Sequence, residues 1–286
     1  MLFEADSGSL VKALNSLGVG DGTVLYVASD IKTFLFQIAM EYGVRTKAQR
    51  NEALHGFIDE FQKTVGPQGT LLFPVFSWDW CRGSGFDIRN TKGEVGTLAN
   101  WVLENRTDFR RTRHPMYSFM VWGKDAALLE AMDNQDAWSH KSPFYYLQTH
   151  HAKQLLFNIE AHQGLTFAHY IEQEVAVPYR HPKYFFGNYT DGEGITEKRM
   201  YSMYVRDMGF ESECSIRNDW LISHGVAVRT EWEKNQLVVV DLEKSYPIIC
   251  DDMTHHNGEN TLYFAGEHLD WKKKQTLAYE VKGIEI

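Results

Sequence analysis

Residues 53–76, ALHGFIDEFQKTVGPQGTLLFPVF, hold the pattern that decides the fold. The apolar side chains of the first half recur with the i, i+3, i+4 spacing of one helix face, at Ala53, Leu54, Phe57, Ile58, Phe61 and Val65. The stretch Gly66 to Gly69 then ends this helix and turns the chain. The compact apolar run from Thr70 to Phe76 predicts a buried strand.

The flanking sequence repeats this alternation of helix, glycine turn and strand. A helix over 10–17 is followed by three glycines and by a strand over 23–28. Further helices are expected at 31–42, 98–104 and 126–132, and further strands at 117–122 and 154–159. Such alternation predicts an α/β fold, a three-layer α/β/α sandwich around a mixed sheet.

From about residue 178 the pattern changes. Residues 226–229 and 237–241 predict two strands joined by a turn at 233–235, which indicates an α+β C-terminal extension. We therefore expect a single domain over 1–286, with an α/β core at 1–180 and the extension at 181–286.

Composition narrows the classes of function. The 286 residues carry 29 Lys and Arg against 38 Asp and Glu, a formal net charge of −9, and 43% are hydrophobic. There is enough apolar material for a packed core, and the acidic balance disfavours nucleic acid and anionic membranes as partners. Three separated cysteines without C-x-x-C spacing argue against a disulfide framework. With no signal-peptide pattern and no long apolar run, a cytoplasmic location is expected.

Several familiar chemical motifs are absent. There is no Walker A loop, no H-E-x-x-H and no G-x-S-x-G, and the glycines at 18, 20 and 22 precede a strand rather than follow one. Neighbouring histidines on a regular element point apart, so the pairs at 150–151 and 255–256 make poor metal sites. We expect no metal.

One histidine stands apart from the other eleven. If a helix begins near Thr166, His169 and Glu172 stand at i and i+3 and share a face. A carboxylate there fixes the imidazole tautomer and leaves the second ring nitrogen as a proton acceptor. An ordinary surface His–Glu pair has the same spacing, so the geometry alone leaves both interpretations open.

An ordered series of short motifs from Gly22 to Lys183 resembles the aminoglycoside 3-N-acetyltransferase family. The motifs are GTVLYVAS at 22–29, GTLLFPVF at 69–76, FD at 86–87 with TKGEVG at 91–96, RHPMYSF at 113–119, SP at 142–143, T-x-x-H-x-x-E at 166–172, and Tyr179-Arg180 with Lys183. Two features depart from the family pattern: Ala28-Ser29-Asp30 replaces the usual His-Ser-Ser, and residues 34–42 resemble an insertion. The resemblance does not extend over the last hundred residues.

The resemblance implies direct acyl transfer from coenzyme A to a primary amine of a sugar-like acceptor, without a metal. His169 is then the general base and Glu172 orients it. The implied coenzyme contacts are Ser29, Asp30, Lys32, Arg113, His114, Ser118 and Ser142, and Tyr179 and Arg180 are assigned to the acceptor. The aromatic residues Trp78, Trp80 and Phe86 are further candidates for the acceptor, because their rings can stack on a sugar or base, but a loop that covers the core has the same composition. The arginines at 110, 111 and 113 form the densest basic cluster, and either phosphate contact or a solvated helix end explains it.

The sequence leaves more than one class of acceptor open. The altered first turn and the unmatched C-terminal third favour a nucleotide-linked 3-amino-deoxyhexose destined for surface polysaccharide. The alternative is aminoglycoside 3-N-acetylation giving antibiotic resistance, and a histidine-ligated metal hydrolase is a remote third. The expected partners are an acyl-CoA, acetyl-CoA or a longer homologue, and an amino sugar, and the chain is a possible homo-oligomer.

Overall fold

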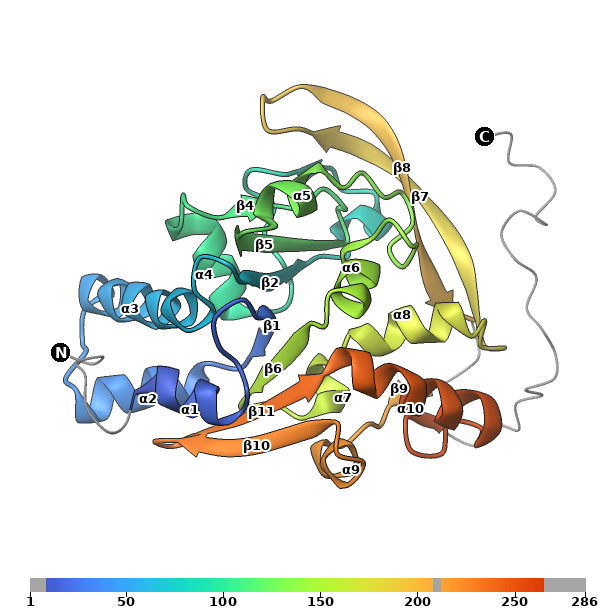
Figure 1. Ribbon diagram of the computed structural model, residues 1–286. Coiled ribbons are helices and arrows are strands. Elements are labelled where there is room, and N and C mark those ends of the chain that lie inside the picture. Colours follow the sequence, from blue (N-terminus) through green and yellow to red (C-terminus); the bar gives the residue numbers. More distant parts are fainter. Residues whose placement is uncertain (1–8, 208–211, 265–286) are drawn as a thin grey trace.

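A seven-stranded mixed sheet forms the centre of the protein in the computed structural model, which describes residues 9–207 and 212–264 (Figure 1). In spatial order its strands are β10 (Ala227–Trp232), β11 (Asn235–Asp241), β6 (Lys153–Phe157), β1 (Val24–Ser29), β2 (Thr70–Phe76), β5 (Tyr117–Gly123) and β4 (Arg110–Arg111). Strands β6, β1 and β2 run parallel at the centre, and the outer strands are antiparallel to their inner neighbours. The predicted mixed α/β fold is confirmed.

Helices cover both faces of this sheet because successive side chains of a strand point to opposite faces. Leu25 and Val27 of β1 lie in one apolar core, and Tyr26 and Ala28 lie in the other. The first core is covered by α1 (Leu10–Ser16), α2 (Lys32–Glu41), α3 (Lys47–Val65) and α4 (Thr97–Asn105). The second is covered by α5 (Ala126–Ala131), α6 (Pro143–Thr149), α7 (Ala161–Gly164), α8 (Phe167–Glu174), α9 (Asn218–Ser223) and α10 (Leu242–His255).

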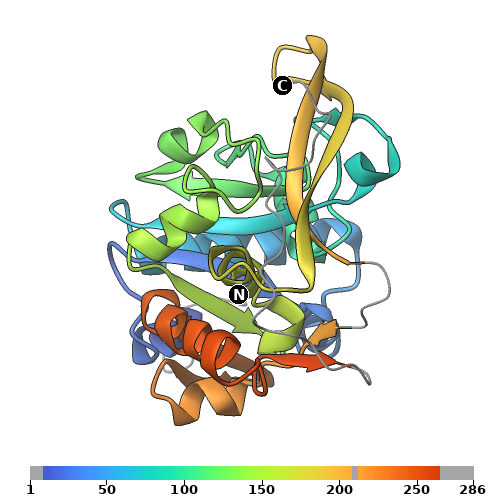
Figure 2. The same ribbon diagram turned by 90° about the vertical axis from the view of Figure 1, so that its right-hand side faces the viewer.

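The C-terminal part of the chain adds one hairpin to the main sheet and forms a separate antiparallel ribbon. Strands β10 and β11 form the expected hairpin, and β11 pairs with β6, so this hairpin extends the main sheet. By contrast β7 (Arg180–Thr190) and β8 (Thr196–Arg206) form a long antiparallel ribbon that rises along one side of the molecule (Figures 1 and 2). The short strand β3 (Phe86–Asp87) pairs with β7, and the 3-10 turn η1 (Asp79–Arg82) also packs against β7. A separate two-stranded sheet is formed by β9 (Ser212–Cys214) and β12 (Leu262–Phe264).

Candidate active site

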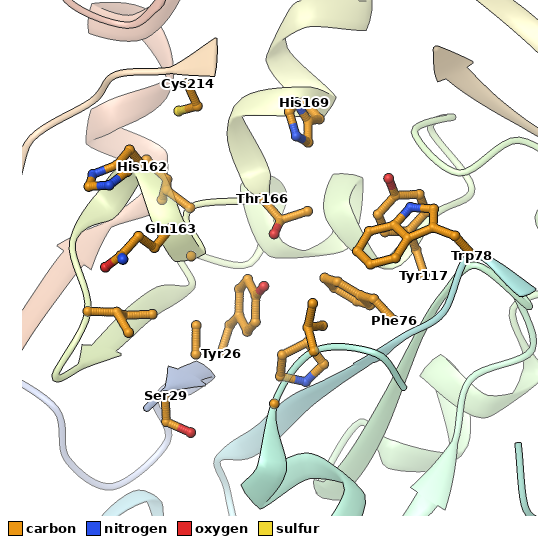
Figure 3. A pocket seen from close by; sticks show the side chains of 17 residues that line it. Tyr26, Ser29, Phe76, Trp78, Tyr117, His162, Gln163, Thr166, His169 and Cys214 are labelled. Carbon is orange, nitrogen blue, oxygen red and sulfur yellow. The ribbon is translucent and has the colours of Figure 1, made fainter. Parts of the chain in front are cut away.

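A cavity of about 290 Å³ opens at the carboxyl ends of β1 and β2 (Figure 3). Its walls include Ser29 at the end of β1, Phe76 at the end of β2, and Trp78 just beyond. The segment from α7 to α8 closes another side, with His162, Gln163, Thr166 and His169. Ligand sites in open α/β sheets lie at this edge, beyond the carboxyl ends of the parallel strands.

The chain between β6 and α8 fixes where His169 stands. Glu160 and Gln163 form a capping box that starts α7. Gly164 lies so close to the sheet that an added Cβ would sit 3.3 Å from both Ala28 and Leu156. Its carbonyl accepts a hydrogen bond of 2.7 Å from the buried amide of Gln154. These contacts hold the start of α8 against the sheet and direct His169 into the cavity (Figure 3).

Glu172 is held by three partners. Its Oε2 lies 2.5 Å from Nδ1 of His169 and 2.8 Å from Nε of Arg180. Its Oε1 accepts a hydrogen bond of 2.5 Å from the Tyr179 hydroxyl. The carboxylate is 1% exposed, and Arg180 in turn donates to the carbonyl of Tyr204. The predicted pairing of His169 with Glu172 is therefore present, inside a larger network that fixes its geometry.

The network keeps the carboxylate charged. Burial alone would raise the pKa of Glu172, but the charges of Arg180 and His169 and the hydrogen bonds outweigh burial and lower it to about 2. Burial and the same carboxylate raise the pKa of Tyr179 well above its ordinary value, so the hydroxyl keeps its proton and donates. Because an ionised carboxylate only accepts, Nδ1 of His169 must carry the proton, and Nε2 is left to act on a ligand.

Of the seven predicted coenzyme contacts, one lines the cavity and the other six do not. Ser29 lines the cavity, and Asp30 next to it accepts from the backbone amide of Lys32 at 2.9 Å and pairs with its ammonium at 3.5 Å. Ser142 is buried and caps the start of α6. His114 is fully buried and its Nδ1 accepts from the backbone amide of Tyr117.

The three clustered arginines differ in exposure and lie apart from the cavity. Arg110 is exposed and pairs with Glu130 at 2.5 Å, while Arg111 is buried over the ring of Phe86 and donates to Ser118. Arg113 lines a separate hollow beside the tip of the β7–β8 ribbon. None of these three arginines lines the cavity at the carboxyl ends of β1 and β2. Ser118 itself is buried and donates to the carbonyl of Val75.

Trp78 alone of the three predicted stacking residues lines the cavity. Trp80 is buried against Gly187 and Tyr201 and donates to the carbonyl of Phe185. Phe86 is buried against Tyr189. Both rings therefore anchor the β7–β8 ribbon, and neither is available for stacking.

Tyr179 and Arg180, predicted as acceptor contacts, bind Glu172 instead. Cys81 does not line the cavity, and burial raises the pKa of its thiol to about 11, so this cysteine is not placed to act as a nucleophile there. Neither observation changes the role expected for His169.

Sequence reasoning missed much of the cavity wall. The lining residues not assigned to it include Tyr26, Phe76, Tyr117, His162, Gln163 and Cys214. The alternation within each strand indicates buried side chains, but it does not show which buried face opens into a cavity. Thr166 is the first residue of the T-x-x-H-x-x-E motif, from which we predicted a helix start but not a place in the cavity wall.

Neither a metal-binding cluster nor a membrane-spanning helix is present in residues 9–207 and 212–264. Within these ranges no group of three or more His, Cys, Asp or Glu side chains is arranged to hold a metal ion. In the same ranges, the helices are all too short or too polar to cross a bilayer.

Several solved structures share the fold of this chain. AAC-IIIb, solved in binary complex with CoASH, matches with a TM-score of 0.67 and 18% identity, over 87% of this chain and 96% of that one. AAC-VIa with bound sisomicin gives a TM-score of 0.67 and 17% identity, over 85% and 96%. YokD of Bacillus subtilis gives 0.62 and 15%, over 85% and 97%. At these identities the likeness is one of fold, and it is the fold of aminoglycoside acetyltransferases.

The family assignment rests on sequence. The family model described as aminoglycoside 3-N-acetyltransferase matches residues 46–249, and the chain belongs to this family. It is therefore an acyltransferase. The match continues well beyond Lys183, so the expectation that the family pattern ends there is wrong. No curated protein sequence gives a significant match to the chain.

Proposed function

We propose that this enzyme transfers an acetyl group from acetyl-CoA to a primary amine of an aminoglycoside. The observation that carries the proposal is that His169, hydrogen-bonded to the buried Glu172 with its partners Arg180 and Tyr179, lines the cavity. The family description and the coenzyme complex of AAC-IIIb support the donor and the reaction.

In the proposed mechanism His169 acts through Nε2. The attacking amine needs a lone pair, so Nε2 accepts a proton from the amine as the nitrogen attacks the thioester carbon. The new C–N bond forms, the carbonyl oxygen becomes an oxyanion, and the C–S bond then breaks as the carbonyl reforms. The imidazolium returns the proton to the departing thiolate, and Glu172 stabilises that imidazolium throughout.

The acceptor differs from the one we favoured on sequence. The nucleotide-linked amino sugar rested on the altered first turn and on a C-terminal third outside the family pattern. The second reason is removed, because the family model extends through residue 249. The names of the fold relatives refer to aminoglycosides, and two of these proteins were solved with sisomicin and with apramycin.

A panel of acceptors tests this proposal. Free thiol released from acetyl-CoA is measured with sisomicin, with apramycin and with a nucleotide-linked 3-amino-deoxyhexose, each against an acceptor-free control. Turnover with an aminoglycoside at a higher kcat/KM than with the nucleotide-linked sugar is expected. The reverse ranking would restore the biosynthetic hypothesis, and no thiol release with any amine would reject acyl transfer to these acceptors.

The role of His169 is tested by His169→Ala. We expect a loss of about 10²–10⁴ in kcat, the usual contribution of a positioned base, with coenzyme A binding retained. Thiol release reports kcat and calorimetric titration reports binding. Near-normal turnover would remove His169 from the mechanism, whereas loss of both readouts would indicate a folding defect.

A further inference from the structure

The cavity has two chemically different walls (Figure 3). On one side Phe76, Trp78 and Tyr117 present aromatic surface. On the other lie Ser29, His162 and Gln163, which are polar. His169 stands between these walls, where two substrates entering from opposite sides would meet. Aromatic rings suit a sugar-like acceptor, which leaves the polar wall for the donor.

A polyanionic donor needs cationic groups at that polar wall. Coenzyme A carries a pyrophosphate and a further phosphate, and the side chains lining the cavity that can become positive are His162 and His169. His169 already faces Glu172. His162 is therefore the one lining side chain, among the described residues, that can offer a positive charge to the donor's phosphates.

Arg217 stands beside His162 and adds a permanent charge. Its Nη1 lies 3.5 Å from Nδ1 of His162. The backbone fixes this proximity, since the amide of His162 donates to the carbonyl of Ile216 at 2.9 Å. The next residue, Asn218, is buried and accepts from the amide of Ala161 at 2.9 Å through its side chain. The start of α9 is thus attached to α7 at the lip of the cavity.

The guanidinium of Arg217 forms no ion pair within the described part of the chain. Among residues 9–207 and 212–264 no carboxylate lies within ion-pair distance of its guanidinium, whereas Lys32 pairs with Asp30 and Arg110 with Glu130. The nearby carboxylate of Glu160 accepts from the backbone amide of Asn218 and caps α7. An exposed, unpaired arginine beside a cavity histidine has the chemistry to hold a phosphate through charge-assisted hydrogen bonds.

We propose that His162 and Arg217 bind the phosphate groups of the acyl-CoA donor at the polar wall of the cavity. This assignment rests on the proposed function for the identity of the donor. It differs from the sequence-based expectation for the arginines at 110, 111 and 113, which do not line the cavity.

Calorimetric titration of the purified full-length chain tests the proposal without requiring turnover. The titrants are coenzyme A and pantetheine, which is the same molecule without its phosphates and adenosine. We expect Arg217→Ala to weaken coenzyme A binding about ten-fold and to leave pantetheine binding unchanged, because one charge-assisted contact is lost. His162→Asn should act in the same direction, and Arg217→Lys should recover part of the affinity.

Arg110→Ala serves as the matched control, since it removes an exposed arginine that is paired with Glu130 outside the cavity. Unchanged coenzyme A affinity in Arg217→Ala, or equal losses with pantetheine, would overturn the proposal. A selective loss of affinity for a nucleotide-linked sugar, with coenzyme A unaffected, would also overturn it by assigning the pair to the acceptor. Normal coenzyme A binding without thiol release in the acceptor panel would reject the proposed function and not this assignment.

Discussion

At the scale of single residues, Glu172 shows what a motif can and cannot predict. The i, i+3 spacing of His169 and Glu172 predicted their contact, because that separation places two side chains on one helix face. The spacing says nothing of Arg180 and Tyr179, which reach Glu172 from the start of the β7–β8 ribbon. Contacts between separate elements depend on how the chain folds back, and no local pattern records that path.

Replacing Glu172 by Gln tests the orienting role. The amide retains the size of the side chain but no longer offers a charged acceptor to both His169 and Arg180. We expect kcat to fall roughly ten- to a hundred-fold, less than in His169→Ala, because the base remains while its orientation and charge balance are lost. Glu174→Gln is the matched control, since Glu174 pairs with His140 outside the cavity. Wild-type turnover in Glu172→Gln would argue against an orienting carboxylate.

The buried His114 leads to a prediction about how the free energy of unfolding changes in acid. Burial lowers the pKa of this imidazole to about 3, against an ordinary value of about 6.5 in the unfolded chain. A depressed pKa means that the unfolded state binds the proton more tightly, so this contribution is complete above pH 6.5 and is lost as the pH falls toward 3. Between pH 6.5 and 5 the free energy of unfolding should decrease by about 2 kcal/mol from this residue.

Urea unfolding at pH 7 and at pH 5 measures this contribution. In His114→Asn the amide oxygen still accepts from the amide of Tyr117, and the pH dependence between these two values should be smaller than in the wild type. The exposed His224 provides the control, and His224→Asn should keep the wild-type dependence. An unchanged dependence in His114→Asn would show that His114 does not carry the effect.

At the scale of elements, the central strands were predictable, whereas the start of helix α3 and the β7–β8 ribbon were not. The apolar run at 70–76 matches β2 at both ends, because a strand buried on both faces is apolar throughout. Helix α3 begins at Lys47, six residues before the apolar pattern, because Thr46 and Gln49 form a capping box. The β7–β8 ribbon was not predicted, since many of its side chains are partly exposed on both faces and no clear alternation arises.

Gly69 joins α3 to the sheet and allows a test at this scale. An added Cβ would lie 2.4 Å from the carbonyl oxygen of Val65 and 2.8 Å from that of Thr23, both backbone atoms that cannot move aside alone. We expect Gly69→Ala to lower the free energy of unfolding by about 2 kcal/mol or more, as overpacking does in a dense region. Thermal and urea unfolding measure the loss.

Gly192→Ala is the control for this substitution. Gly192 has no atom within 4 Å of an added Cβ, and it lies in the turn of the β7–β8 ribbon. Its replacement should change the stability by less than about 0.5 kcal/mol. Equal losses in the two variants would show that the close approach at Gly69 does not determine the effect, because Gly→Ala at an open position is neutral or stabilising.

At the scale of the whole molecule, the net charge of −9 led us to expect a local cluster of basic residues, and the cluster chosen from the sequence does not line the cavity. An acidic protein that binds coenzyme A needs local positive charge. The densest basic stretch in the sequence, residues 110–113, was therefore the expected phosphate contact. Strand geometry instead divides Arg110 and Arg111 between solvent and core. The pair at the cavity comes from residues 55 positions apart, His162 and Arg217, which composition and local spacing do not bring together.

The net charge also separates the two acceptor classes by their response to salt. An acidic protein attracts a polycationic aminoglycoside over long distances and repels an anionic nucleotide-linked sugar. Raising the ionic strength from 0.01 M to 0.15 M shortens the screening length from about 30 Å to about 8 Å and weakens both effects. With saturating acetyl-CoA, kcat/KM for an aminoglycoside should therefore fall severalfold with added salt, whereas kcat for bound substrates should change little. A kcat/KM that stays constant or rises would show that the field of the protein does not guide a cationic acceptor, and it would count against the aminoglycoside as the natural substrate.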